Sequence, residues 1–94
     1  MRPKHTRRDA DHAEIRDGLR ALGAEVWDTA DLGGGVLDLV VFWRGQVVFV
    51  EVKAPGKEGR LTAKQQESML QLLAVGVKAI VATSIEDVVA VFGT

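Results

Sequence analysis

The chain has 94 residues, of which 47% are hydrophobic and 27% are charged, and its formal net charge is -1. This length suits one domain and is too short for two hydrophobic cores, so we expect residues 1–94 to form a single domain. The absence of cysteine excludes disulfides, thiolate metal sites and cysteine nucleophiles, and predicts a reducing cytoplasm.

A net charge near zero argues against binding nucleic acid through bulk positive potential, but positive charge is concentrated in two segments. The basic residues of these segments are Arg2, Lys4, Arg7 and Arg8 in an N-terminal arm (residues 1–8), and Lys57, Arg60 and Lys64 after the middle of the chain. Both segments are candidate phosphate-binding surfaces. The alternative is a frayed terminus and a solvated loop.

The first predicted element is a helix from about Asp9 to Leu22, where apolar residues recur at helical spacing and Gly23 follows as a C-cap. A short strand is expected at Glu25–Asp28. The next segment, Asp31–Gly35, ends in three consecutive glycines, which are typical of a turn or of a close backbone approach.

Two strands rich in valine, leucine and phenylalanine are expected at Val36–Trp43 and Gln46–Lys53, separated by Arg44-Gly45. This pattern predicts a β-hairpin. Because both strands are apolar at nearly every position, we expect both faces of the sheet to be covered.

The second half of the chain begins with a polar loop at Ala54–Arg60. A helix at Thr62–Ala74, a strand at Lys78–Thr83 and a helix at Ile85–Phe92, capped by Ser84, are expected to follow. The resulting order is helix, three strands, helix, strand, helix. It predicts an α/β fold in which helices flank a central sheet.

Three charged residues are expected to meet at one end of the hairpin. If Arg44-Gly45 is a two-residue turn, Asp38 lies opposite Glu51, and Lys53 lies on the same face. Two carboxylates in an apolar strand pair repel each other, and a nearby cation is needed to offset this repulsion. Lys53 or a divalent metal ion would provide the positive charge. The alternative is that these charges face solvent at a strand end. A shift of one residue would place the carboxylates on opposite faces.

The run Asp38-Leu39-Val40-Val41, followed by Phe49-Val50-Glu51-Val52-Lys53, resembles the signature of the PD-(D/E)XK, or restriction-endonuclease-like, nuclease superfamily. More narrowly, the segments Glu51–Gly56 and Gly59–Gln65 resemble the VRR-NUC (virus-type replication-repair nuclease) family, in its small stand-alone phage and bacterial form. The resemblance implies a restriction-endonuclease-like core (αβββαβ) with a mixed sheet and a C-terminal helix. It also implies a bacterial or phage-infected host cell.

The resemblance further implies a site for Mg²⁺ or Mn²⁺. Its ligands would be Asp38, Glu51, the backbone carbonyl of Val52 and Glu14 on the first helix, with Asp17 as the rival of Glu14. Lys53 would orient or deprotonate the attacking water, or stabilise charge on the phosphate.

Gln65 shares a helical stripe with Met69 and Leu73 that we expect to face the sheet. The resemblance implies that its side chain holds Lys53, a water or a phosphate oxygen. The alternative is a capping box, in which Thr62 and Gln65 close the start of their own helix.

The leading hypothesis is a metal-dependent DNA endonuclease selective for four-way-junction or flap DNA, acting with little sequence specificity, as a homodimer. Its DNA-binding residues would be Arg7, Arg8, Lys57, Arg60 and Lys64. One alternative is a non-catalytic DNA-binding module on the same fold. Another is a small α/β protein whose charges are structural.

Overall fold

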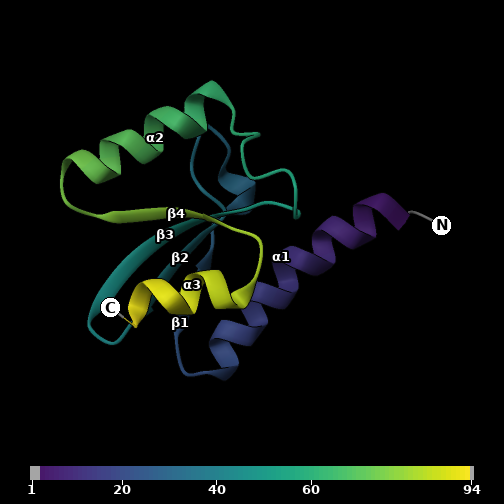
Figure 1. Cartoon of the computed structure of the whole chain (residues 1–94), viewed down its shortest axis with the longest axis horizontal. Coiled ribbons are helices and arrows are strands. Elements are labelled where there is room, and N and C mark those ends of the chain that lie inside the picture. The colour runs from purple at the N-terminus through teal and green to yellow at the C-terminus, as the bar shows by residue number, and fades with distance from the viewer. Residues whose placement is uncertain (1–2, 94) are drawn as a thin grey trace.

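The computed structural model describes the backbone of residues 3–93 and the side chains of residues 11–93. The elements in chain order are α1 (Pro3–Ala21), β1 (Glu25–Asp28), a short 3₁₀ helix η1 (Ala30–Leu32), β2 (Leu39–Trp43), β3 (Gln46–Val52), α2 (Ala63–Ala74), β4 (Lys78–Ala82) and α3 (Ile85–Phe92) (Figure 1). The strands form one sheet in the order β1-β2-β3-β4. The first three strands are antiparallel, and β4 is parallel to β3. The predicted α/β fold with a mixed sheet is therefore confirmed.

Helix α1 begins at Pro3, earlier than the predicted start at Asp9. A proline is well tolerated in the first turn of a helix, and the charged segment that follows it has no apolar periodicity from which a helix could be predicted. The side chains of Arg7 and Arg8 lie outside the described residues. No helix in the described part of the chain is long and apolar enough to cross a membrane.

The hairpin between β2 and β3 has the predicted two-residue turn. Its register runs from Leu39 opposite Val50 to Trp43 opposite Gln46. Arg44 and Gly45 have φ angles of 53° and 73°, the left-handed pair that joins twisted strands tightly. The Arg44 guanidinium lies 4.2 Å from the centre of the Trp43 ring, a cation–π contact that supports an unusual turn residue.

Strand β2 begins at Leu39, so the predicted start at Val36 was too early. Gly33, Gly34 and Gly35 all have positive φ angles, and the chain turns there before it enters the sheet. Strands β3 and β4 each end one residue before the predicted position. These differences leave the register of the sheet unchanged.

Helices α1 and α3 cover one face of the sheet, and α2 lies over the other (Figure 1). The core lies on the first face, and its fully buried residues include Leu19, Leu39, Val41, Val48, Val50 and Val88. The second face is covered only in part, because α2 packs mainly against β4 at one edge of the sheet.

The partial cover leaves apolar side chains on the surface. Trp27 on β1 is 56% exposed and Val47 on β3 is 39% exposed. Leu73 on α2 is 51% exposed, so it does not face the sheet as predicted. The prediction that both faces are covered is thus wrong for the β1 side of the second face.

Candidate active site

The carboxyl end of β3 places Glu51 on the α2 side of the sheet, where its side chain is 1% exposed. Gln65, in the first turn of α2, donates a hydrogen bond from Nε2 to Glu51 Oε2 at 2.9 Å. Lys53 lies two residues further along the chain, on the same side, and its Nζ is 3.4 Å from the same carboxylate oxygen. One buried carboxylate is thus held by an amide and an ammonium group.

The surroundings of Glu51 disfavour its charged form. Burial raises the pKa of Glu51, the negative charge of Asp38 raises it further, and Lys53 acts in the opposite direction. Glu51 Oε1 is buried and has no hydrogen-bond partner within the described residues. Buried polar atoms nearly always have a partner, so this oxygen is available to a ligand.

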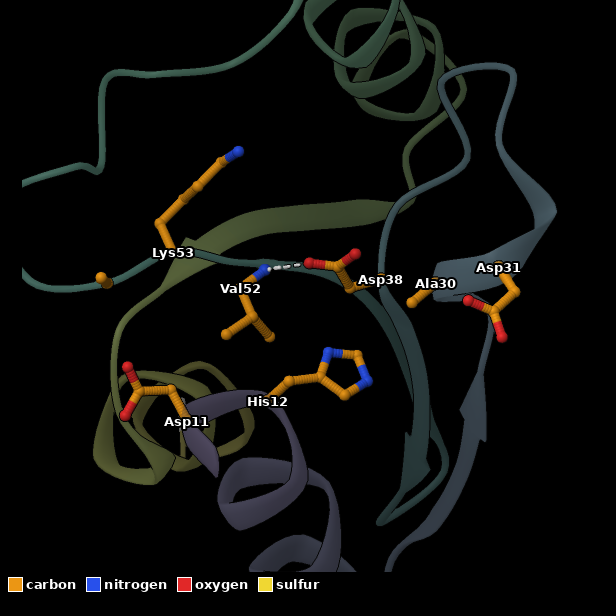
Figure 2. Close-up of a pocket in the computed structure, with 8 residues that line it drawn as sticks. Asp11, His12, Ala30, Asp31, Asp38, Val52 and Lys53 are labelled. Carbon is orange, nitrogen blue, oxygen red and sulfur yellow. Dashed lines mark hydrogen bonds between the residues drawn. The ribbon is translucent and has the colours of Figure 1, made fainter. Parts of the chain in front are cut away.

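Asp38 lies immediately before β2, at the same end of the hairpin. Its Oδ2 accepts a hydrogen bond from the backbone N–H of Val52 at 2.9 Å (Figure 2). Its own carbonyl accepts from the N–H of Thr29 at 2.8 Å. The Asp38 side chain thus takes the place of a backbone acceptor where the ladder between β2 and β3 ends.

A pocket of about 290 Å³ opens beside Asp38. It is lined by Asp11, His12, Ala30, Asp31, Asp38, Val52, Lys53 and Ala54. Figure 2 shows residues of α1 below the pocket and the end of β3 above it. Three aspartates and one lysine make the pocket acidic, which favours a cation.

His12 enters the pocket from α1 and is held there by Asp28 at the end of β1. His12 Nε2 lies 3.0 Å from Asp28 Oδ2, which also accepts from Arg16 Nη1 at 2.8 Å. Burial raises the pKa of Asp28, but the hydrogen bonds from Arg16 and His12 outweigh it and hold the pKa at about 2. Asp28 therefore stays ionised.

Gln65 forms the capping box that was its alternative role, and its amide also bonds Glu51, a partner that was not predicted. Its Oε1 accepts from the backbone N–H of Thr62 at 3.0 Å, and its own N–H donates to Thr62 Oγ1 at 3.1 Å, which completes a capping box. The Nε2 of the same amide reaches Glu51. The first turn of α2 and the buried carboxylate therefore share one side chain.

The remaining predicted site residues lie further out. Glu14 is exposed on α1 and does not line the pocket. Its rival Asp17 is exposed and paired with Arg16 at 2.9 Å. The three basic residues Lys57, Arg60 and Lys64 are exposed on the loop after Lys53 and the first turn of α2. The roles of these residues stay predictions.

Four residues of this region were not predicted from the sequence. Asp11, His12 and Asp31 line the pocket, and Asp28 holds His12. One signal could have identified His12. It precedes Ile15 and Leu19 at helical spacing, and both of these residues are buried. His12 thus lies on the inward stripe of α1, whereas Glu14 does not.

The oxygen donors at this end of the sheet fit a hard divalent cation such as Mg²⁺ or Mn²⁺, which binds one or two carboxylates and keeps several waters. Asp38, the unpartnered Oε1 of Glu51 and the carbonyl of Val52 are such donors. Within residues 11–93, no three side chains of the His, Asp and Glu type are grouped to hold a metal by themselves. Water would therefore have to complete the ligand set.

Comparison with known proteins gives a family match and a structural match. The sequence profile of the VRR-NUC domain matches residues 2–86. A solved structure of a VRR_NUC domain is similar over 92% of this chain and 94% of its own, with a TM-score of 0.72 and 24% sequence identity. No curated protein matches the sequence. The structural match independently supports the αβββαβ core.

Proposed function

Because the chain belongs to the VRR-NUC domain family, whose members are nuclease-type domains that act on DNA, we propose that it is a metal-dependent DNA endonuclease. The observation that carries the proposal is the buried Glu51, whose Oε1 has no partner within the described residues while Oε2 is held by Gln65 and Lys53. A charge buried at such a cost, next to Asp38, is accounted for by a bound cation.

The proposed ligands are Asp38, Glu51 and the carbonyl of Val52, and Glu14 stays the predicted ligand from α1. When bound, the Mg²⁺ or Mn²⁺ ion would supply Lewis acidity toward the phosphate. In the reaction, the oxygen of water bonds to phosphorus and the bond from phosphorus to the leaving sugar oxygen breaks. The leaving oxygen ends protonated.

Lys53 contributes positive charge at this point. Its side chain is only 11% exposed, so its ammonium group is weakly screened by solvent. It would stabilise the negative charge that develops on the phosphate, or orient the attacking water. Gln65 would act on Glu51, by fixing the carboxylate through the 2.9 Å hydrogen bond.

We also propose that the substrate is branched or flapped DNA. The exposed Lys57, Arg60 and Lys64 lie next to the pocket along the chain, and would contact the DNA backbone with little sequence specificity. Arg7 and Arg8, which lie in the first part of α1, would extend this contact. The cytoplasm stays the predicted location.

A homodimer is the assembly we propose. Several apolar side chains are exposed on α2 and the partly covered sheet face, which supports an interface there. They are Trp27, Val47, Leu70, Leu73 and Val75. Light scattering is expected to give twice the mass of the 10.2 kDa chain; a mass of one chain would refute the dimer.

The test of the activity is cleavage of labelled single-stranded, duplex, flap and four-way-junction DNA in Mg²⁺, Mn²⁺ or EDTA. Wild-type protein is compared with Lys53→Ala and with Lys78→Ala, a matched control in which an exposed lysine at the far end of the sheet is removed. We expect cleavage only with metal, lost in Lys53→Ala and kept in Lys78→Ala. Binding without cleavage would instead support a non-catalytic DNA-binding module.

A further inference from the structure

His12 lines the pocket, and the reaction described above gives it no role. It projects from α1, its side chain is 19% exposed, and it lines the pocket together with Asp38, Val52 and Lys53. Figure 2 shows the ring facing the hydrogen bond between Val52 and Asp38. A histidine in this place lies beside Asp38, one of the proposed metal ligands.

The hydrogen bond to Asp28 determines which ring nitrogen of His12 carries the hydrogen. Asp28 accepts from Arg16 and from the N–H of Ala30 at 3.2 Å, and it stays a carboxylate with no hydrogen to donate. Nε2 of His12 must therefore be the donor in the 3.0 Å contact. In the neutral ring, the lone pair then lies on Nδ1.

The chemistry of the pocket limits what Nδ1 can bind. It forms no hydrogen bond with the described residues, and Figure 2 shows it directed toward Asp38 and Val52. Phosphate oxygens and the neighbouring carboxylates are acceptors, so a lone pair does not attract them. The Lys53 ammonium is held by Glu51 and is directed away from His12. The Mg²⁺ ion proposed for the site takes carboxylate, carbonyl and water oxygens in preference to an imidazole nitrogen. Water is the donor that remains.

We propose that His12 is a further catalytic residue, whose Nδ1 accepts a hydrogen bond from the water molecule that attacks the phosphate. Asp28 is the positioning residue that fixes the ring. The bond orients the water so that a lone pair on its oxygen faces phosphorus, and no proton transfer to His12 is part of the proposal. This inference rests on the proposed nuclease function.

The kinetic test uses His12→Gln, which keeps a donor at the place of Nε2 and removes the nitrogen that faces the pocket. His12→Ala removes both. Gln46→Ala is the matched control, because it removes a side-chain hydrogen bond of equal length, 3.0 Å to Lys78, at the far end of the sheet. Single-turnover cleavage at saturating DNA is measured in Mg²⁺, DNA binding is measured in Ca²⁺, and unfolding temperatures are measured for all variants.

We expect His12→Gln to cleave about tenfold to hundredfold more slowly, as when a group that orients an active-site partner is removed. DNA binding and the unfolding temperature are expected to stay at wild-type values, as is cleavage by Gln46→Ala. Wild-type cleavage by His12→Gln would overturn the proposal and leave His12 as a bridge between α1 and β1. If His12→Gln cleaves slowly only because it is partly unfolded, and reaches the wild-type cleavage rate at a lower temperature where it is folded, the proposal is also overturned.

The second test needs no cleavage. Long-range ¹H–¹⁵N correlation spectra of ¹⁵N-histidine protein show which ring nitrogen carries the hydrogen, and the His12→Gln spectrum identifies the His12 signals. We expect hydrogen on Nε2 and a shift of the Nδ1 signal when DNA and Ca²⁺ are added. Hydrogen on Nδ1, alone or together with hydrogen on Nε2, would overturn the proposal. If wild-type protein cuts no DNA, the proposed function fails, and this spectrum alone still decides the assignment of the ring.

Discussion

Glu51→Gln is expected to stabilise the metal-free protein while abolishing its activity. The substitution keeps the shape of the side chain and an acceptor oxygen for Gln65, but it removes a negative charge from a site that is 1% exposed. It also removes the repulsion from Asp38, which together with burial raises the pKa of Glu51. The folded state loses an unfavourable charge that the unfolded state exposes to water.

The size of the effect follows from two opposing contributions. A buried and incompletely paired group costs about 1–3 kcal/mol. Lys53, which is only 11% exposed, loses its charged partner but keeps an amide oxygen as acceptor, which returns about 1 kcal/mol. We therefore expect a net gain of up to about 2 kcal/mol in the free energy of unfolding. In a domain of this size that is a rise of up to roughly 15 °C in the unfolding temperature.

The assay is thermal unfolding followed by circular dichroism, first in EDTA and then with added Mg²⁺. Glu67→Gln on α2 is the control, because it neutralises an exposed glutamate. Mg²⁺ is expected to raise the unfolding temperature of the wild type, by preferential binding to the folded state, and to have little effect on Glu51→Gln. If Glu51→Gln unfolds below the wild type in EDTA while the control does not, the reasoning about the buried charge is wrong.

Two further predictions concern the supports of the site. Asp28→Asn is expected to lower the free energy of unfolding by about 1 kcal/mol at neutral pH. Burial raises the pKa of Asp28, but hydrogen bonding, mainly from Arg16, holds the pKa at about 2. The partial exposure of this carboxylate weakens its stabilising effect. A lowered pKa in the folded protein stabilises it only while the carboxylate is ionised. The difference in stability between wild type and Asp28→Asn should therefore vanish in acid unfolding curves as the pH falls from 3.8 toward 2. A difference that stays constant over this pH range would contradict the prediction. In urea unfolding, Gly35→Ala is expected to destabilise the protein more than Gly34→Ala. Both glycines have a positive φ angle, but only at Gly35 would an added Cβ lie 2.8 Å from the Lys64 carbonyl oxygen. Left-handed backbone alone costs about 1–2 kcal/mol for alanine, so equal losses would show that the close approach is unimportant.

Much of the fold could be predicted from the sequence because its hydrophobic pattern and its turn chemistry agree. The Arg44-Gly45 turn determined the register of β2 and β3, and with it the neighbourhood of Asp38 and Glu51. The sequence could not show that α2 leaves the β1 side of its face open. How two layers are offset depends on packing, which periodicity does not encode.

The pocket was harder to predict than the sheet, for a related reason. Asp28 and His12 are 16 residues apart, and only the packing of α1 on the sheet brings them to 3.0 Å. Asp28 also ends its strand, where an aspartate is unremarkable. Helical spacing places His12 on the inward stripe of α1, but no sequence pattern shows that Asp28 is its partner, whereas the motif around Glu51 lies in one strand.

Gln65 ties the start of a helix to a buried carboxylate, and this restricts which residues can replace it. In most capping boxes, glutamate and glutamine are interchangeable, because only an acceptor is needed at this position. Here the second atom of the amide must donate to Glu51 at 2.9 Å, so a glutamate would place a negative charge against another. The helix alone would accept either glutamine or glutamate at position 65, but the contact with Glu51 requires glutamine. A change to glutamate that leaves the capping of the helix intact would therefore still destabilise the buried carboxylate.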